Sequence, residues 1–212
     1  MKTQDALDDV MSEPFLIAIL DTDIDIEPLV RETRKIVAAY KKNYSDKVDL
    51  TRPYTIVLTE SEQDSKDGGL VSYDTVHDQA HFDRDKPAVL KAEYQKTAFK
   101  DLVAKLPFPF SIIRLSVLPP TTIIGMHTDE SCHAQLAMYT NQDCFVAARS
   151  GETKHVPTDG KLYIISTTLP HMAFNSSQEE RVHVSISIFD EDYTNLLKQN
   201  NNTNTNKAPS NK

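Results

Sequence analysis

Between residues 110 and 190 the apolar positions recur at every second residue, which is the period of a β-strand. The runs that show this period are FSIIRLSVL, CHAQLAMYT, CFVAAR, KLYIIST and RVHVSISIF. Turn signals separate them, namely Pro119-Pro120, Asn141-Gln142-Asp143, Ser150-Gly151 and Asp159-Gly160. Short strands about ten residues apart are typical of a β-sandwich or jelly roll, so we predict a mainly β fold with flanking helices.

The first hundred residues have a different pattern. The apolar run at 14–20 predicts a buried strand, and β-branched residues predict another at 55–58. Residues 27–44 have apolar positions at a helical period, with Asp25 placed to cap a helix, and residues 86–106 predict a second helix that Pro107 ends. We expect residues 1–109 to pack as strands and helices on a core at 110–192, in one globular domain.

Low-complexity polar residues at 197–212 predict a disordered tail. The formal net charge is −8, and because phosphate binding needs clustered Lys and Arg, we expect no nucleic-acid partner. No apolar run has the roughly 18 to 20 residues that a membrane span needs, so no membrane partner is expected. The chain has 2 cysteines, Cys132 and Cys144, and no signal-peptide pattern, so we expect reduced thiols and a cytoplasmic location.

Candidate chemistry centres on His127, Asp129 and His171. In the sequence His127-Thr128-Asp129 the imidazole and the carboxylate are two residues apart, and such residues project to the same side of an extended segment. With His171 they make the two-His, one-carboxylate set that holds Fe(II) and leaves positions open for cosubstrate and dioxygen. The chain has a second His-x-Asp at His81-Phe82-Asp83, but that one lies in a charged stretch outside the β-rich half.

The run that starts at Arg181 alternates strictly, with Arg181, His183, Ser185 and Ser187 on one face and four aliphatic residues on the other. This pattern fits either a half-exposed strand with a solvated polar face or a barrel interior whose arginine clamps a carboxylate. Arg114 and Ser116 share one face of the first run. Arg114 is either a cavity residue or a surface ion-pair partner. In CHAQL the alternation directs His133 and Gln135 inwards, and His133 is either a pocket donor or a hydrogen-bonded core histidine.

These residues resemble the aspartyl/asparaginyl β-hydroxylase family, which are Fe(II)- and 2-oxoglutarate-dependent dioxygenases on a double-stranded β-helix (jelly roll, cupin-like). The similar segments are SVLPPTTIIGMHTDESCHAQLAMYTN, GKLYIISTTLPHMAFN and RVHVSISIFD. In this chain Gly160-Lys161 stands eleven residues before His171, and Arg181 stands ten after it.

The resemblance implies that His127, Asp129 and His171 bind iron and that Arg181 binds the distal carboxylate of 2-oxoglutarate. It implies that Ser116 and His133 contact the cosubstrate. The chain departs from the family pattern where Pro120-Thr121 replaces Pro-Gly and where Cys132 replaces an arginine. Arg114 or Arg149 would then complete the pocket.

The implied reaction hydroxylates an amino-acid or peptidyl substrate, such as an Asp, Asn or Pro residue, with Fe(II), 2-oxoglutarate and O2. The residues Ile123, Ile124, Leu169 and Met172 would line an apolar wall, although each is also an ordinary core residue. Two alternatives remain, a cupin-type metalloenzyme that does not use 2-oxoglutarate and a non-catalytic jelly-roll binding protein. The sequence predicts no oligomeric state.

Overall fold

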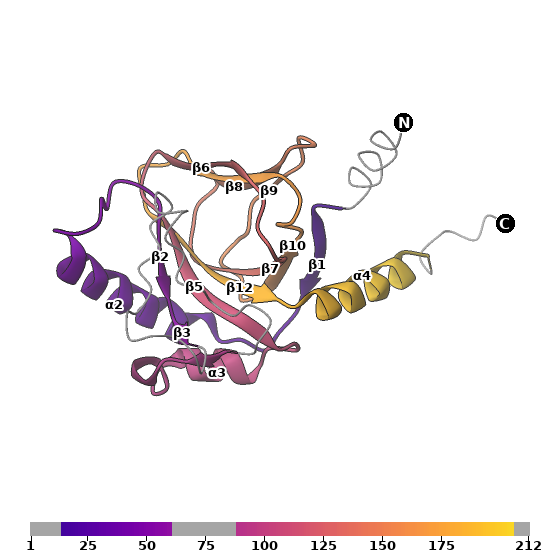
Figure 1. Cartoon of the computed structure of the whole chain (residues 1–212), viewed down its shortest axis with the longest axis horizontal. Helices are drawn as coiled ribbons and strands as arrows, with labels where there is room; N and C mark the ends of the chain where they lie inside the picture. Colours follow the sequence, from indigo (N-terminus) through magenta and orange to yellow (C-terminus); the bar gives the residue numbers. More distant parts are fainter. Residues whose placement is uncertain (1–13, 61–87, 206–212) are drawn as a thin grey trace.

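The structure is a computed structural model that describes residues 14–60 and 88–205. Two antiparallel sheets face each other across a barrel interior (Figure 1). The six-stranded sheet has the order β1 (Leu16–Leu20), β10 (Leu162–Ile165), β7 (His133–Tyr139), β12 (Arg181–Ile188), β5 (Phe110–Leu118) and β2 (Tyr54–Val57). The four-stranded sheet has the order β6 (Thr122–His127), β11 (His171–Asn175), β8 (Cys144–Ala148) and β9 (Thr153–Lys154).

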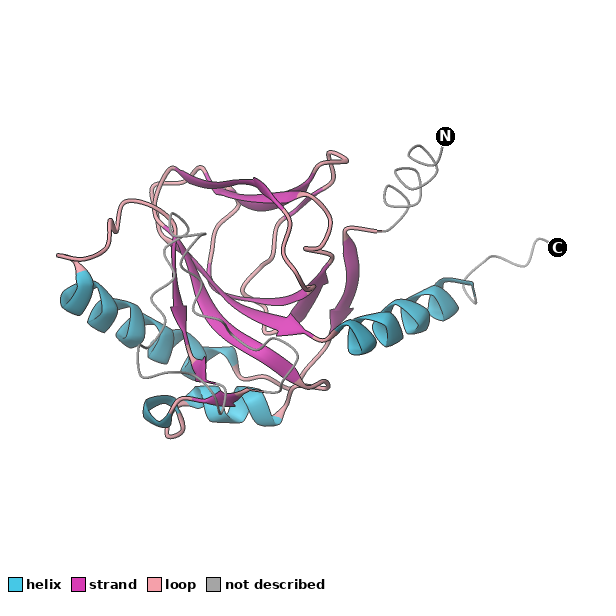
Figure 2. Cartoon of the chain, viewed as in Figure 1, coloured by secondary structure: helices cyan, strands magenta, loops and turns pink. Residues whose placement is uncertain are grey.

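Along the chain the strands from β5 to β12 pass back and forth between the two sheets, and every pairing is antiparallel. This connectivity is that of a jelly roll, so the predicted fold class is confirmed. The strands β1 and β2, which come earlier in the chain, extend the six-stranded sheet at its two edges. The helices lie outside the barrel, as Figure 2 shows. No helix in the described part of the chain is long and apolar enough to cross a bilayer.

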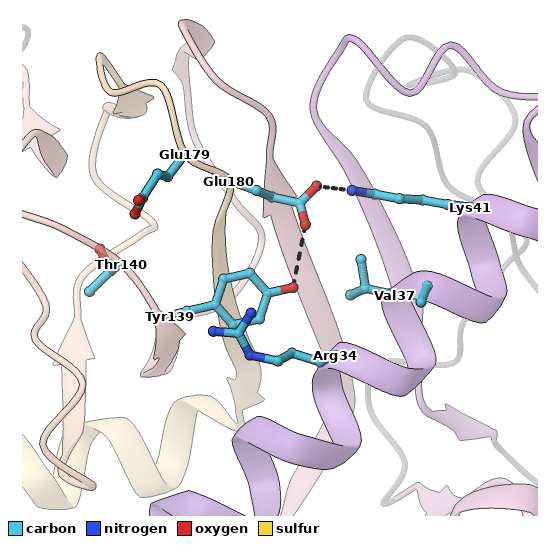
Figure 3. A pocket seen from close by; sticks show the side chains of 8 residues that line it. Arg34, Val37, Lys41, Tyr139, Thr140, Glu179 and Glu180 are labelled. Carbon is cyan, nitrogen blue, oxygen red and sulfur yellow. Dashed lines mark hydrogen bonds and ion pairs between the residues drawn. The ribbon is translucent and has the colours of Figure 1, made fainter.

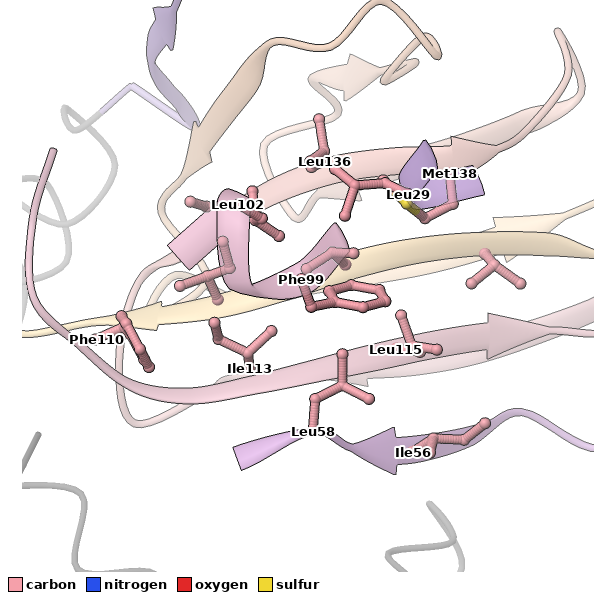
Figure 4. Packing of buried hydrophobic residues seen from close by; sticks show 14 of the residues in the cluster. Leu29, Ile56, Leu58, Phe99, Leu102, Phe110, Ile113, Leu115, Leu136 and Met138 are labelled. Carbon is pink, nitrogen blue, oxygen red and sulfur yellow. The ribbon is translucent and has the colours of Figure 1, made fainter. Parts of the chain in front are cut away.

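The largest apolar core lies on the outer face of the six-stranded sheet, not inside the barrel. There the helices α2 (Ile26–Tyr44) and α3 (Ala98–Ala104) cover the sheet, and Leu29 and Phe99 pack against strand residues such as Leu115 and Leu136 (Figure 4). The alternation of the strands causes this arrangement, because the aliphatic residues of β12 face this core and its polar residues face the barrel interior.

The two early elements agree with their sequence patterns. In β1 the side chain of Ile17 is buried in the core. Helix α2 begins after Asp25, whose side chain accepts a hydrogen bond from the backbone N–H of Glu27, so the predicted cap is confirmed. The motif at His81 lies outside the described residues.

The prediction of one helix over 86–106 was wrong in its extent. Val89–Leu90 forms the short strand β4, which pairs with β3 (Thr59–Glu60), and the 3-10 helix η1 (Ala92–Tyr94) follows. The α-helix α3 starts only after Thr97, whose hydroxyl accepts a hydrogen bond from the backbone N–H of Phe99. Pairing with a segment thirty residues earlier competes with the helix here, and a helical period cannot reveal such pairing.

At the C-terminal end the structure also departs from the sequence-based expectation. A disordered tail was predicted for 197–212, whereas helix α4 (Asp190–Thr205) continues to Thr205, and residues 206–212 lie outside the description. Acidic residues in the first turn of α4 favour a helix, and Tyr193 and Leu196 pack against the core. Because starting a helix is the costly step, the polar residues that follow Leu196 can extend a helix whose first turns are already held by the core.

The turn between β5 and β6 has one unusual residue. Thr121 has φ of 55°, a left-handed conformation that disfavours β-branched side chains, and its N–H donates to the carbonyl of Ser177. This is the position at which the chain has Pro-Thr instead of the family's Pro-Gly. The predicted turns at Gly151 and Gly160 are confirmed by their positive φ values of 91° and 77°.

Candidate functional site

His127 and His171 meet because their strands are neighbours in the four-stranded sheet. His127 ends β6, His171 begins β11, and the two residues are direct cross-strand partners. A register shift lies next to this pair, between His171 and Ala173, and the two ring centroids are 4.3 Å apart. The pairing brings two imidazoles, which are forty-four positions apart in the sequence, to one point at the edge of the barrel interior.

Backbone carbonyls determine which ring nitrogen of each histidine carries the proton. The Nδ1 of His127 lies 2.8 Å from the carbonyl oxygen of Gly125, and the Nδ1 of His171 lies 3.0 Å from that of Leu169. A carbonyl oxygen only accepts hydrogen bonds, so each Nδ1 carries the proton and each Nε2 keeps its lone pair. This is the arrangement that metal-binding histidines have, with the second nitrogen held by an outer partner.

Asp129 completes the group. Its backbone N–H donates to the carbonyl of Thr167 at 2.8 Å, which holds the segment after β6 against the segment before β11. The carboxylate then lies 3.8 Å from Nε2 of His127 and 3.5 Å from Nε2 of His171. One donor atom from each residue lies within 4.8 Å of the others. Two imidazole lone pairs and one carboxylate at this spacing fit a divalent transition metal such as Fe(II).

The charges at this site are poised for metal binding. Burial raises the pKa of Asp129, but the nearby His133, Arg114, His171 and His127 outweigh burial and lower it. Burial lowers the pKa of His171 in spite of the adjacent carboxylate, so its ring is neutral at pH 7. The His127 side chain is 32% exposed and the His171 side chain 5%, so the site opens to solvent on the His127 side.

His133 lies behind Asp129 and joins it to Arg114. Its Nδ1 is 3.2 Å from Oδ2 of Asp129, and its Nε2 is 3.2 Å from Nη2 of Arg114. Since a guanidinium only donates, Nε2 accepts and Nδ1–H donates to the carboxylate. The Nε of Arg114 is buried and has no hydrogen-bond partner among the described residues, so it is a donor that a bound anion would satisfy.

Arg181 and Ser116 lie on the interior face of the six-stranded sheet. All eight residues of β12 are buried, so the solvated-face alternative is wrong for this strand, and its polar residues face the barrel interior. Arg181 is 2% exposed. His183, two residues later on β12, is the cross-strand partner of Ser116 on β5. Because β7 and β12 run antiparallel and Ser187 is the partner of His133, Arg181 lies at the far end of the interior from the metal group.

Two interior residues, Gln135 and His183, were on the correct face by sequence but had no assigned role. His183 contacts Arg181 at 3.1 Å and 2.7 Å, and Gln135 contacts both His183 and Ser185. The signal for them was the alternation itself, since each is two residues from a predicted site residue. Phe15 was also missed, and its ring centroid lies 6.4 Å from that of His171.

The predicted apolar wall is only partly supported. Ile123 is 57% exposed, so it is not a core residue, and it pairs with Phe174 on the outer face of the four-stranded sheet. The register shift in β6 explains the difference, because it changes which residues face inwards. Arg149 has an exposed side chain, and it follows Ala148, the cross-strand partner of His171.

A cavity of about 520 Å³ lies outside the barrel, between α2 and the end of β7 (Figure 3). There Lys41 forms an ion pair with Glu180 at 2.5 Å, and the Tyr139 hydroxyl donates to the same carboxylate at 3.4 Å. The Arg34 guanidinium lies 4.7 Å from the centroid of the Tyr139 ring. The residues that line this cavity do not include the metal group, so it is a separate feature.

Three of the solved structures that are similar to this chain all have TM-scores under 0.5. A Trichoplax adhaerens prolyl hydroxylase in complex with a hypoxia inducible factor peptide fragment has a TM-score of 0.45 and 10% identity over 92% of this chain and 97% of that chain. A Burkholderia pseudomallei oxidoreductase of the 2OG-Fe(II) oxygenase family has 0.38 and 11% over 80% and 83%. A Bordetella pertussis cupin domain has 0.33 and 23% over 37% and 80%.

The sequence comparisons give a more definite result than these low structural scores. No curated protein matched the chain. The family described as "Aspartyl/Asparaginyl beta-hydroxylase" matches residues 55–191, which is more than half of the chain. The match starts at β2, well before the segments in which the resemblance is evident by inspection, and it includes every residue of the metal group. The chain belongs to the aspartyl/asparaginyl β-hydroxylase family of oxygenases.

Proposed function

We propose that this chain is an Fe(II)- and 2-oxoglutarate-dependent hydroxylase of an amino-acid or peptidyl substrate, with Asp, Asn or Pro as the modified residue type. The observation that carries the proposal is the convergence of His127, Asp129 and His171. In both histidines a backbone carbonyl accepts from Nδ1–H, so the Nε2 lone pair is left for a metal. In the proposal these three residues bind the iron on one face and leave its other positions open.

When bound, Fe(II) with 2-oxoglutarate and O2 supplies oxidative chemistry in which one oxygen atom enters a substrate C–H bond and the other enters succinate, with release of CO2. The chain's own residues hold and orient. His133 donates to Oδ2 of Asp129, which leaves Oδ1 to face His127. Phe15, Val146 and Ala148 pack in one buried apolar cluster, which would exclude water from one side of the interior.

The polar half of the interior supports a dicarboxylate cosubstrate. Arg181 at the far end would bind the distal carboxylate of 2-oxoglutarate, and Ser116 lies one strand away on the same face. The buried Nε of Arg114 provides a second donor nearer the metal group. His133, which the resemblance implies as a cosubstrate contact, would share its role between the cosubstrate and Asp129.

The substrate would approach from the His127 side, where the site is open to solvent. Arg149 follows the strand residue that pairs with His171, and its exposed side chain would bind a substrate carboxylate. The proposal keeps a cytoplasmic location and no nucleic-acid or membrane partner. A charge reversal, Arg149→Glu, that leaves substrate affinity unchanged removes the role of Arg149.

The experiment is an anaerobic titration with Fe(II), then 2-oxoglutarate, followed by air and a succinate assay. We expect a visible charge-transfer band and slow succinate formation without substrate. His127→Ala should abolish both, and Arg181→Ala should weaken both. His81→Ala is the matched control, since it removes the histidine of the other His-x-Asp motif, and it should retain both signals.

Two results would replace the proposal. Metal binding with no response to 2-oxoglutarate, and no effect of Arg181→Ala, would indicate a cupin-type metalloenzyme with another cosubstrate. No metal binding, with His127→Ala changing only stability, would indicate a non-catalytic binding protein.

A further inference from the structure

The interior face of β12 contains a chain of hydrogen bonds that starts at Arg181 and leads away from it. Nε of Arg181 donates to Nε2 of His183 at 3.1 Å, and Nη2 of Arg181 lies 2.7 Å from Nδ1 of the same ring. Gln135 on β7 follows, with its Oε1 3.4 Å from that Nδ1 and its Nε2 donating to the Ser185 hydroxyl at 3.2 Å. All four residues are buried.

The donors and acceptors in this chain require a neutral His183. A guanidinium has five N–H donors and no acceptor, so Nε2 offers Arg181 its lone pair, and Nδ1 carries the proton that faces Oε1 of Gln135. An imidazolium has no lone pair, and it would add a second positive charge beside the first. The imidazole therefore orients Arg181 and leaves the positive charge of the guanidinium unchanged, which an aspartate in the same place would cancel.

Groups around the ring act in the same direction. Burial, together with the charges of Arg181 and of His155, holds the pKa of His183 well below its usual range. Gln135 contacts the ring at Nδ1, and the Ser185 hydroxyl in turn accepts from the Gln135 amide. The position of the guanidinium is thus determined by contacts on two strands.

We propose that His183 is a positioning residue for Arg181, a neutral acceptor that fixes the guanidinium and so selects a 2-oxo acid with a distal carboxylate. The inference rests on the proposed function, because it assigns Arg181 to the distal carboxylate of the cosubstrate. His183 itself touches Arg181 and Gln135 and is not a contact of the reacting atoms.

The first test uses the unaltered protein and needs no cosubstrate. In 15N-histidine NMR spectra the His183 ring should stay neutral from pH 8 to pH 5.5. In 15N-arginine spectra the Nε–H of Arg181 should exchange slowly with water. A ring that is protonated at pH 7, or a rapidly exchanging Nε–H, overturns the inference even if the protein binds 2-oxoglutarate.

The second test compares two variants of His183 in Mn(II)-loaded protein under argon. His183→Phe keeps the bulk of the ring but removes the acceptor, and it should weaken 2-oxoglutarate binding by about 10- to 100-fold, because the lost bond is to a charged group. His183→Gln keeps an acceptor and should restore most of the affinity. The affinity for 2-oxobutyrate, which has no distal carboxylate, should be the same in both variants.

Tyr163→Phe is the matched control, since Tyr163 is a buried neighbour of Gln135 across the sheet but its hydroxyl donates to Asp159, outside this hydrogen-bond chain. Equal weakening of both oxo acids, or equal effects of Tyr163→Phe and His183→Phe, overturns the positioning role. If the wild-type protein binds no 2-oxoglutarate but the Arg181 Nε–H is slow in wild type and fast in His183→Phe, the proposed function fails and the positioning of Arg181 stands.

Discussion

Replacement of His133 by alanine should weaken metal binding although His133 is not in the metal group. The side chain is 4% exposed and links Oδ2 of Asp129 to Nη2 of Arg114, with both distances 3.2 Å. Without its Nδ1–H the carboxylate loses the contact that turns Oδ1 towards His127. Loss of such an outer partner typically costs about 10- to 100-fold in metal affinity, which is about 1.4 to 2.7 kcal/mol.

Stability should fall as well, for a reason on the other side of the ring. Arg114 already has one buried donor without a partner, its Nε. Removing the acceptor at Nη2 leaves a second unsatisfied donor on a charged group, at a cost of about 1 to 3 kcal/mol. We therefore expect the metal-free His133→Ala protein to unfold at a lower urea concentration than the wild type.

The assay is an anaerobic Co(II) titration followed by the metal's visible absorption, together with urea unfolding of the metal-free protein. Ser187→Ala is the matched control, because Ser187 is buried and is the cross-strand partner of His133 but is not part of the link from Asp129 through His133 to Arg114. A Co(II) affinity of His133→Ala within twofold of the wild type would refute the reasoning. His133→Gln, which can donate and accept, should have a Co(II) affinity between those of His133→Ala and the wild type.

Other expected outcomes concern the backbone, the outer core and acid. Thr121→Gly should raise the free energy of unfolding in urea by about 0.5 to 1 kcal/mol, because glycine adopts the left-handed conformation without strain. A lower free energy of unfolding would show that Thr121 is not strained. Phe99→Ala, at a fully buried position, should lower it by about 3 to 5 kcal/mol, whereas Val89→Ala, at a position 54% exposed, should change it by under about 0.5. Since His171 and His183 have lowered pKa values, the unfolded chain binds more protons below about pH 6.5. The free energy of unfolding of metal-free protein should be highest above that pH and fall below it by up to about 1.4 kcal/mol per pH unit for each ring, and a flat urea profile from pH 7 to 5.5 would contradict this.

Alternation along single strands predicted much of this molecule. It placed Arg181 and His183 on one face of β12, and the same rule placed His133 and Gln135 together on β7. Local capping chemistry predicted the start of α2 at Asp25. These features depend on residues close in sequence, and for that reason a single sequence contains the information.

What failed depends on contacts between distant segments. Val89 and Leu90 pair with β3, and no local pattern reveals a partner some thirty positions away. The register shift in β6 turned Ile123 outwards, and the link from Asp129 through His133 to Arg114 requires the relative placement of β5, β7 and the segment after β6. Sequence predicted which residues were available, whereas the sheet register decided which of them touch.

The six-stranded sheet is apolar towards its helices and polar towards the barrel, and this has a consequence for where the chain can be cut. A fragment of residues 110–192 would keep the metal group but would lose α2, α3 and the edge strands β1 and β2. Its Leu115 and Leu136 would lose their cover and face water, and both sheet edges would be open to other chains. Such a fragment should aggregate. The amino-terminal half is therefore required for the oxygenase site to fold, and the site cannot be expressed as an independent domain.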